Sequence, residues 1–272
     1  MTTIHPTSDN YPYSFADATE VPACIPDVSH WQGDIDADKF IVAGAHGVII
    51  RAGFAGSAGG SHEDSKFKIN AAKFQGKIPM GAYWYYRPEV DAVDQADKFC
   101  SLMKRFDLHI PPVADVESNT QGFYPASFTQ KLHAFLLRVQ VAHGIKPTIY
   151  TRASFWNPCL GDPPWAGDYD LWIARYATLP KPWGNPGDPS WTTPSSWDTW
   201  RLWQWSADGN GRGAEFGAES DDIDLNRYNG SLDQFYQWCG WKQEPPPPDD
   251  PEEPCKCCDV LKKIYELAKR YI

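Results

Sequence analysis

Two carboxylates separated by one residue, Asp115 and Glu117, follow an apolar stretch in PPVADVES, residues 111–118. In an extended strand, residues two apart point to the same face, so both acids are aimed at one small volume. Two like charges held this close resist ionising together, and we expect one carboxyl to have a raised pKa while its neighbour stays anionic. Such a pair can perform acid–base catalysis, although an isolated pair more often caps a helix or meets a surface lysine.

Further acids stand where other strands are expected to end. Asp27 ends the first strand and Asp224 closes the last, within DIDLN. In β/α barrels, reactive groups from several strands gather at the carboxyl ends of those strands. Together with Asp115 and Glu117, these residues form a set of four carboxylates that we expect to converge.

The elements that must position these acids alternate between strands and helices. Asp36 is expected to cap a short helix, and further helices are predicted over residues 64–74, 90–105 and 127–142, the last ending near Gly144. This alternation implies a mostly parallel sheet, and about eight strands imply a barrel. The predicted strands lie in ACIPDVS, GVIIRAGFAG, IPMGAYWYYRP, the segment around Asp115, KPTIYT, DLWIARY, RLWQWSA and ESDDIDLNRYNG.

Composition narrows the class of protein. The chain has 272 residues, a formal net charge of -10 and thirteen residues each of Trp, Tyr and Phe. The acidic balance argues against nucleic acid and an anionic membrane surface as partners, because both attract clustered Lys and Arg. No apolar run approaches the ~20 residues needed to span a bilayer. The surplus of Trp and Tyr suits both an aromatic core and the stacking of sugar rings.

The cysteines and the first residues bear on where the protein is made. MTTIHPTSDNYPYSF has neither the basic nor the apolar region of a secretory signal. Seven scattered cysteines then predict mostly reduced thiols of a protein made in a cytoplasm, with Cys100, Cys159 and Cys239 buried and inert. CKCC, residues 255–258, has no second ligand pair for structural zinc, so we expect neither a metal nor a cofactor.

The domain boundaries follow composition. Residues 1–20 are polar and aperiodic and predict an N-terminal leader, followed by one α/β domain over residues 21–242. The proline-rich acidic stretch at 243–254 indicates a stiff linker. Residues 255–272 carry apolar side chains every three to four positions from 259 onward, which predicts a short amphipathic helix. Such a helix is marginal alone, and self-association through residues 259–272 is favoured over a role as an anchor.

The motifs, taken together, resemble glycoside hydrolase family 25 muramidases, the lysozyme type common among phage endolysins. The resemblance covers about residues 23–230 in family order, with Trp84 standing where the family often has His. Trp84 alternates with Tyr83 and Tyr85, so we expect it to face away from the barrel interior. The matching segments are PDVSHWQGDID, GVIIRAGFA with Asp64 downstream, GAYWYYRP followed by QADKF, PPVADVES, PTIYT, LWIARY, WQWS and IDLNRYNG.

The resemblance implies a flattened, irregular β/α barrel that cleaves the bond between N-acetylmuramic acid and N-acetylglucosamine in peptidoglycan. It implies that Asp27, Asp115, Glu117 and Asp224 form the acidic active-site cluster, with Glu117 the proton donor. Asp115 is then either a nucleophile or the group that orients the substrate's own N-acetyl group. Six aromatic residues are candidate walls for stacking sugars, or alternatively core residues: Tyr83, Tyr85, Tyr150, Trp172, Tyr176 and Trp203.

Several functions are compatible with these sequence features to different degrees. A phage endolysin, made in the host cytoplasm and acting on the wall after release, fits the lack of a signal-like segment better than a secreted bacterial autolysin does. A catalytically silent peptidoglycan-binding protein on the same scaffold is disfavoured by the intact carboxylate set. A chitinase-like hydrolase is weakened because the DxxDxDxE pattern of chitinases is absent.

Overall fold

The computed structural model of the protein describes residues 22–176 and 193–242. Contacts divide the chain into two units, Met1–Trp241 and Lys242–Ile272, and the elements below belong to the first. The predicted leader 1–20, linker 243–254, helix 255–272 with Cys255, Cys257 and Cys258, and self-association through 259–272 lie outside the described residues. None of the helices described is long and apolar enough to cross a bilayer.

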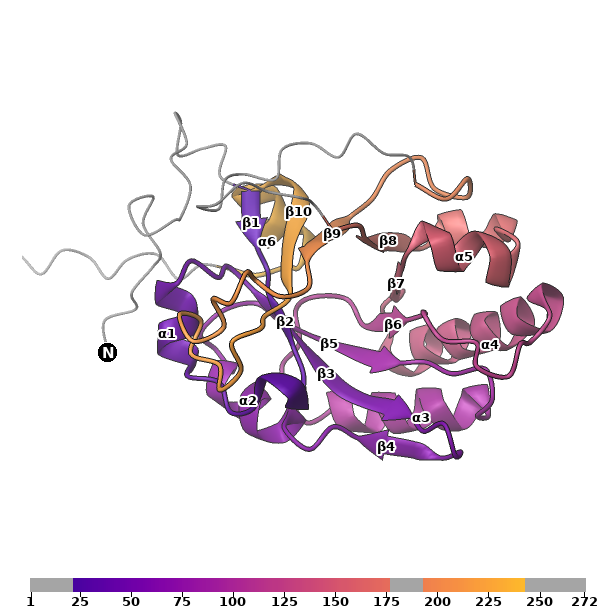
Figure 1. Cartoon of the computed structure of the whole chain (residues 1–272), viewed down its shortest axis with the longest axis horizontal. Coiled ribbons are helices and arrows are strands. Elements are labelled where there is room, and N and C mark those ends of the chain that lie inside the picture. The colour runs from indigo at the N-terminus through magenta and orange to yellow at the C-terminus, as the bar shows by residue number, and fades with distance from the viewer. Residues whose placement is uncertain (1–21, 177–192, 243–272) are drawn as a thin grey trace, which may run out of the picture. The chain divides into compact units, whose positions relative to one another are not determined.

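A single curved sheet organises this unit (Figure 1). Its strands run in the spatial order β1-β10-β9-β8-β7-β6-β5-β3-β2, with β4 paired to β3. Neighbours from β2 to β9 along this path are parallel, as the alternation of strands and helices predicts. The strands are β1 Pro22–Cys24, β2 Asp27–Val28, β3 Val48–Ala55, β4 Ser61–Glu63, β5 Met80–Tyr85, β6 Val113–Asp115, β7 Thr148–Thr151, β8 Asp170–Ala174, β9 Leu202–Ser206 and β10 Leu225–Ser231.

The segment from β1 to β2 joins the two ends of the sheet. β1 pairs antiparallel with β10, and three residues later β2 pairs parallel with β3. Between them, the N–H of Ile25 donates to the carbonyl of Asn226 at 3.0 Å, and that of Asp27 to the carbonyl of Asp224 at 3.1 Å. The sheet therefore closes into an irregular barrel, and Asp27 and Asp224 meet at the seam.

β10 departs from the parallel arrangement because it runs antiparallel to β9. A parallel return needs a crossover, usually a helix, whereas residues 207–224 form turns and loops without one. The first strand is correspondingly split into β1 and β2. The predicted number of about eight strands is thus close, but the last neighbour pairs are antiparallel.

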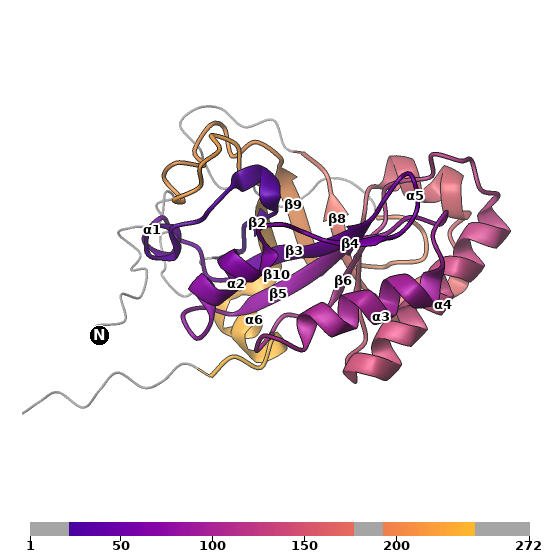
Figure 2. The ribbon, with the colours of Figure 1, turned by 90° about the horizontal axis from the view of Figure 1, so that it is seen from below.

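Helices cover the outside of the parallel strands, and α3 and α4 pack side by side there (Figure 2). Asp36 caps α1 as predicted, accepting from the N–H groups of Asp38 and Lys39, and Gly144 ends α4 in the left-handed conformation with φ 83°. The helices are α1 Ala37–Val42, α2 Phe67–Phe74, α3 Ala92–Met103, α4 Pro125–His143, α5 Ala153–Leu160 and α6 Leu232–Trp238, with 3₁₀ turns at His30–Gln32 and Pro164–Asp168.

Alternation along β5 sends its side chains to two different cores. Trp84 is fully buried in the larger core, against Phe99 of α3, and its indole N–H donates to Gln95 at 3.1 Å. Tyr83 packs instead with the smaller cluster that contains Tyr150 and Trp172. The prediction that Trp84 faces away from the barrel interior is therefore confirmed.

Candidate active site

A cavity of about 170 Å³ opens where the parallel strands end. Asp115 ends β6 and Glu117 follows two residues later, while Tyr150 and Trp172 come from β7 and β8. Asp224 immediately precedes β10 and reaches the same cavity by the opposite strand direction. Nine residues line it: Asp27, Tyr83, Asp115, Glu117, Tyr150, Trp172, Tyr176, Gln204 and Asp224.

All four predicted carboxylates lie in this cavity. Asp115 is buried, and its Oδ1 has no hydrogen-bond partner among the residues that the structure describes. Glu117 is less deeply placed, and its Oε2 lies 3.9 Å from Nη1 of Arg152. The two acids therefore share a volume but differ in support, because Glu117 lies beside Arg152 and Asp115 makes no ion pair within the described residues.

Burial raises the pKa of both members of the pair. The pKa of Asp115 is raised well above its usual range, chiefly by burial and next by the Glu117 carboxylate. Burial also raises the pKa of Glu117, and the Arg152 guanidinium partly offsets this. The sequence predicted one raised pKa beside an ordinary anion. The structure differs because the closed barrel removes both groups from water, which disfavours the charged form of each.

The pKa values of the remaining two carboxyl groups, Asp224 and Asp27, are raised as well. Burial raises the pKa of Asp224 from 3.8 to about 9, with the charges of Asp27 and Glu117 adding to the effect. Burial raises the pKa of Asp27 only to about 6, because Asn226 and Gln204 donate hydrogen bonds to it. The cavity thus holds carboxyls in different protonation states at neutral pH, which is what acid–base chemistry needs.

A measurement of stability against pH tests the raised pKa of Asp224. A carboxyl whose pKa is higher in the folded than in the unfolded state binds more protons when folded. Its contribution to the free energy of unfolding is therefore complete below pH 3.8 and is lost as pH rises towards 9. We expect the free energy of unfolding to fall between pH 7 and 9, and Asp224→Asn to flatten that fall. Urea unfolding of both proteins at pH 7, 8 and 9 is the measurement; equal slopes would contradict the assignment.

The predicted aromatic walls divide into three groups. Tyr83, Tyr150 and Trp172 line the cavity as a packed floor, with Tyr150 and Trp172 edge to face at 4.7 Å. Tyr176 also lines the cavity and is 58% exposed, so its ring is open to a ligand. Tyr85 does not line the cavity. Burial is the main cause of its raised pKa, and the charges of Asp115 and Glu117 raise that pKa further.

Trp203, a candidate for either a sugar-stacking wall or a core residue, lies in the core. Its side chain is 2% exposed in the larger core, near Trp200, and its indole N–H donates to the carbonyl of Arg175 at 2.6 Å. Alternation along β9 turns Trp203 and Trp205 outward and Gln204 inward. The polar residue between two tryptophans in WQWS was the signal for the cavity-lining position.

Gln204 and Asn226 are the site residues that sequence reasoning missed. The Nε2 of Gln204 donates to Oδ2 of Asp27 at 2.9 Å, and the Nδ2 of Asn226 donates to the same oxygen at 2.8 Å. Both amides are buried. Asn226 belongs to the DIDLN segment, in which only Asp224 was singled out.

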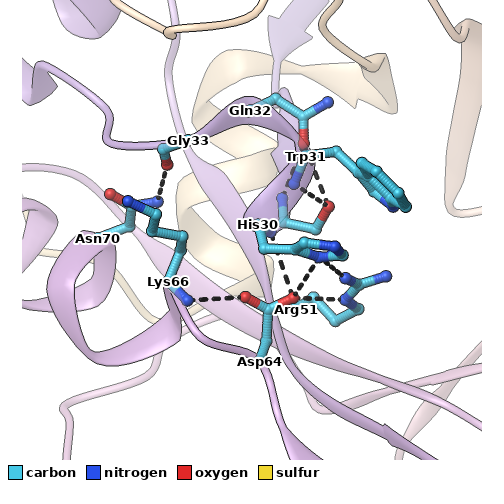
Figure 3. A network of polar contacts seen from close by, with 9 residues as sticks. His30, Trp31, Gln32, Gly33, Arg51, Asp64, Lys66 and Asn70 are labelled. Carbon is cyan, nitrogen blue, oxygen red and sulfur yellow. Dashed lines mark hydrogen bonds and ion pairs between the residues drawn. The ribbon is translucent and has the colours of Figure 1, made fainter. Parts of the chain in front are cut away.

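A second polar network lies beside the cavity, around Asp64 (Figure 3). The Nε of Arg51 donates to Oδ2 of Asp64 at 2.7 Å, and the backbone N–H of His30 donates to the same oxygen at 3.2 Å. The side chains of Arg51 and His30 are also hydrogen-bonded to each other. Arg51 links this network to the cavity, because its charge partly offsets the raised pKa of Asp115. Trp31 projects from the same turn and is 72% exposed.

The thiols in the described part of the chain are unsuited to nucleophilic chemistry. Cys100 and Cys239 are buried as predicted, and burial raises the pKa of both, that of Cys239 to about 11. Cys159 is half-buried. Burial also raises the pKa of Cys24 to about 12. The thiols with raised pKa values are therefore protonated at neutral pH and are poor nucleophiles.

Comparisons with known proteins agree with this geometry. The sequence model of glycosyl hydrolases family 25 matches residues 26–214. Lysozyme M1 of Streptomyces globisporus is 34% identical in an alignment of 218 residues, which covers 75% of this chain and 67% of the relative. The N,O-diacetylmuramidase of Arthroderma benhamiae is 25% identical, covering 78% of this chain and 84% of that protein.

Solved structures share the architecture. The bacterial lysozyme from Streptomyces coelicolor superimposes with a TM-score of 0.67 at 27% identity, over 82% of this chain and 99% of that one. A barrel that gathers four carboxylates in an aromatic-floored cavity defines a glycoside hydrolase of the lysozyme class. With residues 26–214 matched, the chain belongs to glycosyl hydrolases family 25.

Proposed function

We propose that the protein is an N-acetylmuramidase that hydrolyses the β-1,4 bond between N-acetylmuramic acid and N-acetylglucosamine in peptidoglycan. The observation that carries the proposal is the convergence of Asp27, Asp115, Glu117 and Asp224 in one cavity of a family 25 chain. Relatives named lysozyme and N,O-diacetylmuramidase support this substrate class.

In the proposed reaction, Glu117 donates a proton to the glycosidic oxygen as the bond to the leaving sugar breaks. Its raised pKa supports this role, because a general acid must be protonated near the working pH. Asp115 faces the same volume and supports the positive centre that develops at the sugar carbon. It does so either as a nucleophile or by orienting the substrate's N-acetyl group. Mass spectrometry of enzyme quenched during turnover separates these, since only a nucleophile leaves a glycosyl adduct on Asp115.

The aromatic floor and the open ring of Tyr176 would hold the sugar during this reaction. Tyr150 and Trp172 restrict the depth of the cavity, whereas Tyr176 presents a face on which a pyranose ring can stack. Replacing Tyr176 by alanine is expected to raise KM several-fold, while Tyr176→Phe keeps the stacking face and stays close to wild type. Initial rates on solubilised peptidoglycan check this; equal KM values for both variants would remove Tyr176 from binding.

Product analysis tests the proposed bond directly. Purified protein is incubated with peptidoglycan, and the new reducing ends are reduced with borohydride and identified after acid hydrolysis. We expect muramitol, which marks cleavage after N-acetylmuramic acid. Glucosaminitol would instead make the protein a glucosaminidase, and binding without new ends would support the silent peptidoglycan-binding alternative.

We propose further that the enzyme works as a phage endolysin, made in the host cytoplasm and acting on the wall after release. Expression in bacteria with and without a membrane-permeabilising protein tests this role. Lysis only in the presence of that protein supports it, whereas lysis by the enzyme alone favours a secreted autolysin. Self-association through residues 259–272 is a separate proposal, which light scattering on the full chain and on a chain ending at Gln243 would test.

A further inference from the structure

The hydrogen bonds of Asn226 fix the orientation of its side-chain amide. The indole N–H of Trp172 donates to its Oδ1 at 2.8 Å, and an indole nitrogen can only donate. On the other side, its Nδ2 lies 2.8 Å from the carbonyl oxygen of Ile25, which can only accept. Exchanging the amide nitrogen and oxygen would break both contacts, so the NH₂ group must point towards Ile25 and Asp27.

The carboxylate of Asp27 receives this NH₂ group and a second one. Its Oδ2 lies 2.8 Å from Nδ2 of Asn226 and 2.9 Å from Nε2 of Gln204. The hydroxyl of Tyr150 donates to Oε1 of Gln204 at 2.7 Å, which leaves the Gln204 nitrogen for Asp27. An oxygen that accepts two N–H donors carries no proton, and donors of this kind favour the ionised form of a carboxyl.

The other carboxyl groups of the cavity lack comparable support. Within the described ranges, Oδ1 of Asp115 is buried without a hydrogen-bond partner, and the ion-pair partner of Glu117 is the Arg152 guanidinium, 3.9 Å away. The two amide donors are therefore concentrated on one of four acids. This asymmetry is built by β9 and β10, strands that carry none of the four carboxylates themselves.

We propose that Gln204 and Asn226 are positioning residues that keep Asp27 as the resident anion of the cavity, while Glu117 keeps the proton that it donates. The proposal rests on the muramidase function proposed above and assigns Asp27 a distinct part in it. A fixed anion at this place stabilises the positive charge that develops on the sugar, and its repulsion helps to keep the proton of the general acid on Glu117.

The groups that face Asp27 fit this assignment. Its charge contributes to the raised pKa values of acids and phenols on several different strands. The positive charges nearby are directed at other groups, since Arg51 pairs with Asp64 and Arg152 lies beside Glu117. The ionisable groups facing it are Tyr83 of β5, Asp115 and Glu117 at the end of β6, Tyr150 of β7, Tyr176 after β8 and Asp224 before β10.

Two substitutions remove the donors in different ways. Gln204→Met keeps the length of the side chain without its N–H groups, and Asn226→Asp keeps the shape but replaces the donor by a carboxyl. Each is expected to raise the pKa of Asp27 by about one unit or more, because one donor to a charged group is lost. The acid limb of the pH–activity profile should move upward by the same amount, with kcat at pH 5 about tenfold lower.

Matched controls exist in the larger core. Gln95 is a buried glutamine whose amide bonds Trp84 and the backbone of Arg87 and Val90, and Asn70 is a buried asparagine between Ile35 and Gly33. Gln95→Met and Asn70→Asp make the same chemical changes away from the carboxylates. They should lower stability and leave the acid limb where it is in wild type.

The deciding measurement is the titration of Asp27 by carboxyl ¹³C NMR, with the resonance assigned by its loss in Asp27→Asn. The proposal expects Asp27 to be ionised at pH 7 in wild type and its pKa to rise in Gln204→Met. An Asp27 that is protonated at pH 7, or whose pKa is the same in a folded Gln204→Met, overturns it. If Asn226→Asp fails to fold, Gln204→Met carries the test. The titration needs no substrate, so it stands even if product analysis rejects the muramidase function.

Discussion

Replacing Glu117 by glutamine is expected to lower kcat on peptidoglycan by about 10²-fold or more while the protein stays folded. Glutamine keeps the size and hydrogen-bonding capacity of the side chain but has no proton to donate to the leaving oxygen. Burial already disfavours the charged form of Glu117, so a neutral amide should not reduce the free energy of unfolding at pH 7. Release of reducing ends and thermal unfolding, measured on the same preparation, check both parts.

Glu89 offers a matched control for this substitution. It is also a half-buried glutamate on a neighbouring loop, where it accepts hydrogen bonds from the hydroxyl of Thr120 at 2.6 Å and the N–H of Gln121 at 3.2 Å. Glu89→Gln should retain near wild-type turnover. A folded Glu117→Gln with turnover equal to that of Glu89→Gln would remove Glu117 from the role of general acid.

Asp115→Asn is expected to have the second large effect, with opposite signs on activity and stability. Turnover should fall by about 10²-fold or more, because the group that supports the developing positive centre loses its capacity for charge. Stability at pH 8 should rise, because burial and Glu117 hold the pKa of Asp115 well above its usual range and ionising it there costs free energy. Each kcal/mol added to the free energy of unfolding raises Tm by about 2–4 °C.

The sign of the stability change distinguishes this variant from an ordinary loss of a polar contact. Asp170 lies outside the cavity, accepts from Nε of Arg201 at 3.0 Å and from the indole of Trp238 at 3.1 Å, and should lose stability when changed to asparagine. Activity of Asp170→Asn should stay near wild type. An Asp115→Asn protein that melts below wild type at pH 8 would show that the carboxylate is stabilising there, contrary to its burial.

Replacing Asp115 by asparagine should also change the pKa of Glu117. To the extent that Asp115 is ionised, Asp115→Asn lowers the pKa of Glu117 by removing a like charge. The basic limb of the residual activity should then move to lower pH, and a limb that stays in place means that Asp115 is already protonated in the resting cavity. Profiles of residual activity across pH 4–9 make the comparison.

Much of this architecture was predictable because its signals are local or periodic. The cap at Asp36, the left-handed end of α4 at Gly144 and the outward direction of Trp84 each depend on neighbours within a few residues. The placement of Asp115 and Glu117 at and just after the end of β6 follows from the rule that the parallel strands of a barrel end on one face. Asp27 and Asp224 were expected at strand ends too, but Asp27 begins β2 and Asp224 precedes the antiparallel β10. The structure places all four in the cavity.

Other features depend on contacts between distant segments, which no local pattern encodes. Asp27 meets Gln204 and Asn226 across separations of 177 and 199 residues, and this pairing exists only because β1 and β2 close the sheet between β10 and β3. The direction of β10 is likewise decided by a loop that has no crossover helix.

Burial accounts for the remaining differences between the sequence predictions and the structure. Trp203 was a candidate for sugar stacking by its type, but strand alternation and the larger core turn it away from the cavity. Asp115 and Glu117 predicted one shifted pKa by proximity alone, whereas closure of the barrel desolvates the whole cluster and raises all four. The sequence by itself determined which groups could react and roughly where they would meet. Which of them hold protons depends on solvent exclusion and on amide donors brought in from β9 and β10, and only the tertiary structure sets these.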